Sequence, residues 1–230
     1  MRIRLPRPLK GWRVFAGEVG VIVLGVVLAL GAQQFAENLQ MRSEVREFRR
    51  TIDHEIGLNL FAYQVRSRGS ACNKKRIDDV VRWVKESPAS SLPKAHLGGP
   101  VTLMPYRSAW NNRDARVFNA LPAKSRLKYA EFYDELDNNY RHIELEENAW
   151  SRLARYRLPG PVTLADRRDM AEQLQLAWGL ENIWEPDIQV SRKIADELGI
   201  KPVRPDNLPP EIDKWLAECR PAFAATAAGG

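Results

Sequence analysis

The clearest pattern along the chain is an apolar run close to its beginning. The 19 residues from Val14 to Ala32 contain a single charged side chain, Glu18. A helix of this length covers roughly 28 Å, which is close to the hydrocarbon thickness of a bilayer. We therefore expect a transmembrane helix over residues 14–36, preceded by a basic tail over residues 1–13.

Two other interpretations of this run remain open. It can be a removable secretion signal, because Ala29-Leu30-Gly31 is a tolerable cleavage sequence, or the buried core helix of a globular domain. A retained anchor is favoured because helical spacing of apolar residues continues without a break. These residues are Phe35, Leu39, Val45, Phe48, Ile52, Ile56, Leu60 and Tyr63. The spacing predicts that the anchor helix runs on into the first helix of a following domain.

Further helices are expected after this one. Ile77, Val80, Val81 and Val84 predict a second helix that ends at Ser87-Pro88. Residues 87–106 are rich in Pro and Gly and predict a loop or a short extended segment. A short helix is then expected from Ser108, as its cap, to Phe118.

Two longer helices are predicted in the second half of the chain. The first follows Leu121-Pro122, ends at the Pro-rich stretch 158–161 and has an apolar face interrupted near Glu147. The second begins at the capping sequence Thr163-x-x-Asp166, ends at Gly199 and should be kinked or split by Pro186.

The end of the chain predicts a last helix from Pro209 through Cys219, followed by a small-residue tail over 221–230 that we expect to be disordered. No strand-type alternation persists anywhere. Residues 37–220 are therefore expected to form an all-α domain, an antiparallel helical bundle that continues from the anchor helix.

The charge distribution bears on location and partners. The formal net charge is +6, and removing the five bases of the first 13 residues lowers it to +1. These bases are Arg2, Arg4, Arg7, Lys10 and Arg13. Acids and bases are interleaved elsewhere, which is unlike a nucleic-acid-binding patch, so no nucleic-acid partner is expected. The positive-inside rule predicts a cytoplasmic N-terminus. We expect a single-pass inner-membrane protein of a Gram-negative bacterium, with the domain after the span in the periplasm.

One side of the predicted anchor carries a second pattern. Small residues and Glu18 recur three or four positions apart, and Gly25-x-x-x-Ala29 is a small-x-x-x-small pair that allows close approach of helices in lipid. The expected interface residues are Glu18, Ile22, Gly25, Ala29 and Ala32. They predict a homo-oligomer formed through the membrane helix, with the lipid bilayer as the other partner of this segment.

The same residues carry a family resemblance. Glu18 followed by Ile22-Val23-Leu24-Gly25-Val26-Val27-Leu28-Ala29-Leu30 resembles the E-x-x-x-I-V-L-G-V-x-L-A-L signature of an uncharacterised bacterial family of membrane-anchored proteins. The likeness covers about residues 12–37; Phe35 stands where many members have Trp, and Glu37 is kept. The resemblance implies a basic tail, one span and a helical C-terminal region, and no activity.

Cys72 and Cys219 are the only two cysteines. In an exported domain such a pair is expected to form a disulfide, here between the first long helix and the last. Two free buried thiols in a cytosolic protein are the alternative. Their spacing matches no metal-binding or thioredoxin motif.

No motif assigns a reaction, a metal or a cofactor. "HEIGL", from His54, lacks the second histidine of a zinc-protease helix. Of the glutamates close to His142 in sequence, only Glu146 shares its helix face, and a metal site needs more ligands. Acid–base candidates cannot be selected among Asp53, Asp134, Glu135 and Asp137. Catalytic residues are thus unknown, and neither a cofactor nor a metal is expected. Most tryptophans are expected to anchor the helical core, namely Trp83, Trp110, Trp150, Trp178, Trp184 and Trp215.

Three functions remain as hypotheses. We favour a structural or interaction role, a scaffold for an unknown protein partner, which needs only an exposed apolar patch. A periplasmic sensing or small-molecule-binding module would need a concave aromatic pocket between helices. A periplasmic hydrolase would need convergent carboxylates in a cleft.

Overall fold

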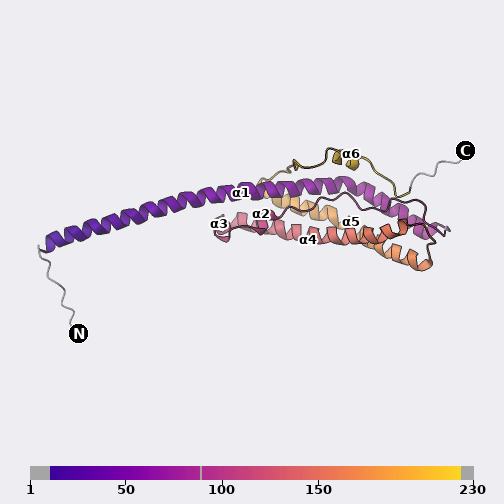
Figure 1. Ribbon diagram of the computed structural model, residues 1–230, viewed down its shortest axis with the longest axis horizontal. Helices are drawn as coiled ribbons and strands as arrows, with labels where there is room; N and C mark the ends of the chain where they lie inside the picture. Colours follow the sequence, from indigo (N-terminus) through magenta and orange to yellow (C-terminus); the bar gives the residue numbers. More distant parts are fainter. Residues whose placement is uncertain (1–10, 89, 224–230) are drawn as a thin grey trace, which may run out of the picture.

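The structure, a computed structural model, describes residues 11–88 and 90–223. Its longest element is α1 (Trp12–Glu86), an unbroken helix of 75 residues whose first part projects from the rest of the molecule (Figure 1). The separate helix expected around Ile77 is wrong: those residues form the end of α1. No proline interrupts α1, and apolar or small side chains keep the helical spacing, so nothing stops the helix before Ser87.

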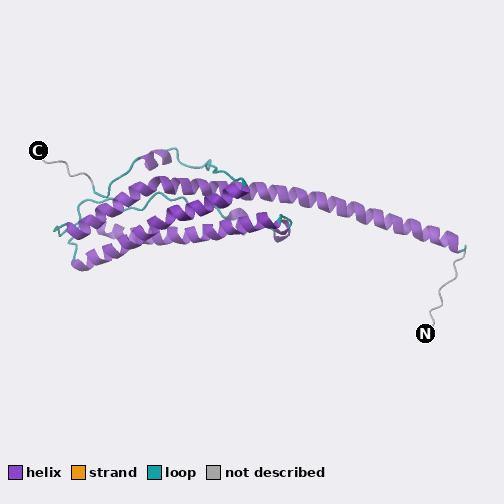
Figure 2. Ribbon diagram, turned by 180° about the vertical axis from the view of Figure 1, so that it is seen from behind, coloured by secondary structure: helices purple, strands orange, loops and turns teal. Residues whose placement is uncertain are grey.

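A three-helix bundle is formed by the second half of α1 with α4 (Ala123–Ala154) and α5 (Leu164–Leu198) (Figure 2). Asp53 contacts Tyr129 and Arg66 contacts Glu146, so α1 and α4 run in the same direction. α5 is antiparallel to both. Residues 87–107 make this possible because they return the chain along the bundle between the two parallel helices. The prediction of an all-α fold is confirmed, but the bundle is not antiparallel throughout, because α1 and α4 are parallel.

Shorter helices complete the chain: α2 (Ser108–Asn111), α3 (Ala115–Asn119), a 3-10 turn η1 (Arg155–Arg157) and α6 (Ile212–Ala217). The single helix expected over 108–118 is therefore two. Asp114 separates them because its carboxylate accepts hydrogen bonds from the backbone N–H groups of Arg116 and Val117, which starts α3. The last helix was expected to run from Pro209 through Cys219, but α6 covers only Ile212–Ala217.

The ends of α5 agree with the sequence, and its middle does not. Thr163 and Asp166 form a reciprocal capping box, and Gly199 ends the helix with φ 76°. The expected split at Pro186 is wrong, since α5 is one helix. Pro186 and Asn182 are both exposed, so the carbonyl that loses its helical partner can bond water.

Two apolar clusters make up the core of the bundle. The first lies at the end where α1 enters the bundle and contains Ile52, Ile56, Phe132, Leu136 and Ile188 among others. The second lies at the far end of α1 and contains Ile77, Val80, Trp150, Met170 and Leu174 among others.

The tryptophans only partly follow the prediction. Trp83, Trp150 and Trp184 are buried, and Trp110 is partly buried in the first apolar cluster. Trp178, however, is 50% exposed on the outside of α5, so its assignment to the core is wrong. The side chain of Trp215 lies outside the described residues.

The chain after α5 runs back along α1. The Val203 N–H donates to the carbonyl of Gly57, and α6 packs beside α1 with Arg68 paired to Asp213. Ala222 is fully buried and Phe223 bridges to Ala95, so the expected disordered tail does not begin at residue 221. Residues 224–230, the remainder of that tail, lie outside the described residues.

By length and composition, one helix among the described residues could cross a membrane, and it is α1. Its apolar stretch near the N-terminus is not buried within the chain, so the run is not part of the core of this domain. This test does not separate a retained anchor from a signal sequence.

Candidate functional site

A layer of buried polar side chains separates the two apolar clusters. Arg66 and Asn73 of α1, Glu146 of α4 and Glu181 of α5 meet there, and their exposed fractions are 1%, 0%, 2% and 1%. Charged residues are almost never this deeply buried unless they are paired. The layer is therefore the most unusual feature inside the bundle.

Arg66 holds the layer together. Its Nη2 lies 2.9 Å from Glu146 Oε1 and 2.7 Å from Glu181 Oε2. The guanidinium group also lies over the ring of Trp184, 5.1 Å from its centroid. One cation thus joins all three helices of the bundle.

Glu181 is surrounded by donors. Besides Arg66, it accepts hydrogen bonds from Asn73 Nδ2 at 2.5 Å and from the hydroxyl of Ser70. Glu146 has fewer short contacts: Arg66 donates to it, Asn73 Nδ2 lies 3.4 Å away, and a hydrogen bond from the Trp184 side chain lowers its pKa only as a minor cause. The two carboxylates therefore differ in how well their charge is compensated.

The electrostatics of Glu146 follow from this difference. Burial raises the pKa of its carboxyl above 4.5, the nearby charge of Glu181 adds to the rise, and Arg66 opposes it. One guanidinium cannot neutralise two carboxylates, so the layer carries an excess negative charge whenever both are ionised. Protonation of Glu146 removes that excess.

The layer cannot act on a substrate in this conformation, because solvent reaches neither carboxylate. The carboxylates of the layer converge in the core, out of reach of a substrate. A separate groove of about 410 Å³ on the surface of α4 and α5 is lined by Glu131, Asp134, Glu135 and Glu197, with Lys128 and Lys193 among them. A physical role is available instead: sliding one helix along another would leave a buried charge unpaired, which costs several kcal/mol. We infer that the layer fixes the register of the three helices.

The predicted disulfide is confirmed. Cys72 of α1 and Cys219 after α6 are bonded, with their Cα atoms 5.4 Å apart and 147 positions separating them in sequence. The bond ties the last part of the chain to the far end of α1.

The predicted membrane-helix interface stays a prediction. Glu18, Ile22, Gly25, Ala29 and Ala32 are all exposed on the projecting part of α1. A methyl group added at Gly25 would meet no atom within 4 Å. This face is therefore free to contact lipid or a second helix.

The other candidate acids and histidines do not form one site: Asp134 and Glu135 line a groove on the bundle surface, and the rest lie elsewhere. Asp53 accepts from Tyr129 at 2.6 Å, Asp137 pairs with Arg107 at 2.5 Å, and His142 pairs with Asp187 at 3.2 Å. His54 is exposed on α1. In residues 11–88 and 90–223 no group of three or more His, Cys, Asp or Glu could hold a metal ion.

Comparison with known proteins adds nothing to this description: no family model, no curated protein and no solved structure matches the chain. The family resemblance of residues 12–37 thus stays a prediction.

The polar layer was missed in the sequence although its signal is there. On α1, Tyr63, Arg66, Ser70, Asn73 and Ile77 follow the three–four spacing of a buried face. If only the apolar residues of that face are considered, its buried polar residues are overlooked. The same spacing places Glu181 between Ala177 and Trp184, and Glu146 between Ile143 and Trp150.

Proposed function

We propose that this chain is a single-pass inner-membrane protein of a Gram-negative bacterium, and that its helical domain serves as an interaction scaffold in the periplasm. The observation that carries the proposal is the continuity of α1. One helix joins the exposed apolar run to the bundle core without a break or a hinge.

The continuity would fix the height of the bundle above the membrane. Val45 and Phe48 are the first residues of α1 that pack against the core of the bundle. Val45 follows the expected end of the anchor, at residue 36, by about 9 residues, or roughly 13 Å of helix. The domain would therefore lie close to the bilayer surface and turn with its anchor as one body.

Two features support the periplasmic orientation. The basic residues lie before the apolar run, as the positive-inside rule requires of a cytoplasmic flank. The bond between Cys72 and Cys219 suits an oxidising compartment, because cytosolic thiols are normally kept reduced.

Apolar side chains on the outside of α5 support the interaction role. Leu176, Ile183 and Val190 are 39%, 42% and 45% exposed and recur every seven residues, so they lie along one stripe of the helix. We propose that a second copy of this chain packs against this stripe. The small-residue face of the anchor would bring two chains together, and equal helices would hold the two stripes at the same height.

Photocrosslinking in native membranes tests this role. A photoreactive residue at position 183 should give an adduct of twice the mass of the chain. The same residue at 182, where an exposed Asn precedes the stripe, should give far less of it. Equal yields at both positions, or none at 183, would contradict self-association through α5.

A small-molecule-binding role is the second candidate. This role was expected to need a concave aromatic pocket between helices. Trp150 and Trp184 do not provide one, because both are buried in the core. A groove of about 470 Å³ does lie between α1 and α5, lined by Val81, Val84, Leu174 and Trp178 among others.

A further inference from the structure

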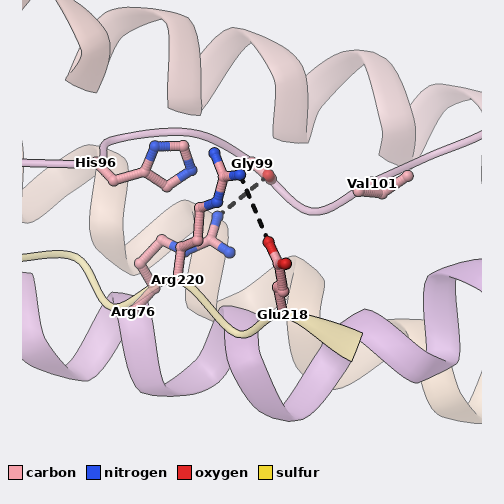
Figure 3. A pocket seen from close by; sticks show the side chains of 6 residues that line it. All are labelled: Arg76, His96, Gly99, Val101, Glu218 and Arg220. Carbon is pink, nitrogen blue, oxygen red and sulfur yellow. Dashed lines mark hydrogen bonds and ion pairs between the residues drawn. The ribbon is translucent and has the colours of Figure 1, made fainter. Parts of the chain in front are cut away.

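A cavity of about 220 Å³ lies beside the disulfide, between α1, the return segment and the chain after α6. Figure 3 shows two guanidinium groups and an imidazole ring gathered around it. Its lining residues are Arg76, His96, Gly99, Val101, Glu218 and Arg220. Five of the six are neutral or basic, and one is acidic.

The disulfide builds this cavity. Arg76 follows Cys72 by one turn of α1, and Arg220 is the residue next to Cys219. Joining the two cysteines therefore brings together two guanidinium groups that are far apart in sequence. Two such groups repel each other unless an anion lies between them.

Arg76 is the fixed side of the cavity. It is only 7% exposed and donates from Nη1 to the carbonyls of Gly98 and Gly99, at 3.2 Å for Gly99. Its Nε–H has no hydrogen-bond partner among the described residues. A buried donor without a partner is costly, so an acceptor oxygen bound beside it would be stabilising.

We propose that the cavity between Arg76 and Arg220 binds a small oxyanion, the phosphate or carboxylate group of a soluble ligand. Guanidinium groups match the geometry of both groups and bind them through paired N–H donors. The volume is several times the ~30 Å³ that one water molecule takes up in the liquid, so a group of several heavy atoms fits. The anion site itself does not depend on the proposed membrane role, whereas the choice of a soluble ligand over a lipid headgroup rests on the proposed anchor.

The surrounding charges agree with an anion. Burial lowers the pKa of His96, and the positive charges of Arg76, Arg157 and Arg220 lower it further. The imidazole is thus neutral near pH 7 and placed among cations. A bound anion would cancel part of their field, so the pKa of His96 should rise on binding.

A lipid headgroup of the membrane that holds the proposed anchor lies too far from the cavity to supply that anion. Arg76 lies 40 residues beyond the expected end of the anchor at residue 36. A continuous helix of that length extends ~60 Å. The ligand is therefore a solute.

Glu218 is the internal competitor. Its carboxylate lies 3.6 Å from Arg220 Nη2 and 3.8 Å from Lys214 Nζ. With 44% of its side chain exposed, Glu218 can turn toward solvent when another anion takes its place. Removing its charge should therefore strengthen binding, and removing the Arg220 charge should weaken it.

The test uses the full chain in detergent micelles with the disulfide intact. Sodium phosphate, and separately sodium acetate, is added at constant ionic strength against sodium chloride, and the His96 ring signals are followed by NMR. Saturable shifts and a higher His96 pKa are expected from at least one anion, which also distinguishes phosphate from carboxylate. His54, exposed elsewhere on α1, is the internal reference.

Variants decide whether the site is specific. Arg220→Gln should weaken binding about tenfold, the equivalent of one charge-assisted hydrogen bond, and Glu218→Gln should tighten it several-fold. Arg220 has 65% of its side chain exposed, so its loss should leave the fold intact. Arg204→Gln, which removes another exposed arginine, should bind like the wild type.

If the anion is an adventitious ion only, the NMR shifts of His54 and His96 grow together without saturation, and the proposal is overturned. It is equally overturned if Arg220→Gln and Arg204→Gln bind both anions as the wild type does.

Discussion

Arg66 Nη2 lies 2.7 Å from Glu181 Oε2 in the middle of the bundle, and the two side chains are 2% and 0% exposed. Replacing Arg66 with Met should therefore be strongly destabilising, because two buried carboxylates lose their cation. Breaking a buried ion pair from one side costs about 3–5 kcal/mol. Chemical denaturation measures the loss. Arg68→Met, two residues away with 55% of its side chain exposed, is the control and should cost less than about 1 kcal/mol.

Glu146 gives the bundle a pH dependence whose sign follows from its raised pKa. The folded state holds the proton more tightly than the unfolded state, so the stability from this group is complete below about pH 4.5. It is lost as the pH rises through the higher pKa of the folded state. Glu146→Gln cannot lose a proton, so its stability relative to wild type should increase over that interval.

Denaturation at a series of pH values measures this difference. Glu147→Gln, at the exposed next position of α4, is the control and should follow the wild type. A constant difference between Glu146→Gln and wild type from pH 4 to pH 8 would contradict the proposed excess charge of the layer.

Local patterns were enough to predict the helical class, the α5 caps at Thr163 and Gly199, and the disulfide. They were not enough for the arrangement of the helices. The parallel pairing of α1 and α4 depends on a return segment whose course is set by contacts distant in sequence, such as Asn59 with Tyr106.

The polar layer and the anion cavity were missed for a related reason. Glu146 was considered only beside His142 on its own helix, whereas its partners lie on α1 and α5. Likewise, nothing local relates Arg76 to Arg220 until Cys72 and Cys219 are bonded. Spacing within one helix can mark a polar residue as buried, but it does not show which residues of other elements that side chain meets.

Gly57 should not tolerate a side chain. A Cβ at this position would lie 2.6 Å from Val203 Cγ2 and 2.9 Å from the carbonyl oxygen of Lys201, which packs the returning chain onto α1. Gly57→Ala should destabilise the domain by about 1–3 kcal/mol despite its better helix propensity. In the same helix, Gly69→Ala meets only Pro100 Cβ at 3.9 Å and should stabilise by up to about 1 kcal/mol. Melting temperatures that move in the same direction for both variants would refute this packing argument.

The disulfide should stabilise the domain as a single unit. Cys72→Ala and Cys219→Ala should each lower the free energy of unfolding by about 2–4 kcal/mol, and the double variant should be little worse than either, because one bond is lost in every case. A reductant should lower the melting temperature of wild type and leave the variants unchanged. Strictly additive losses would show that the cysteines act separately.

We propose that α1 is a retained anchor and that the bundle lies outside the cytoplasm. The most direct measurement adds protease to spheroplasts, washes the membranes with alkaline carbonate and identifies the remaining peptides by mass spectrometry. The protease should digest the bundle, while a membrane-embedded fragment containing Glu18 through Ala32 remains. An undigested full-length chain, or a mature N-terminus next to Gly31, would contradict it.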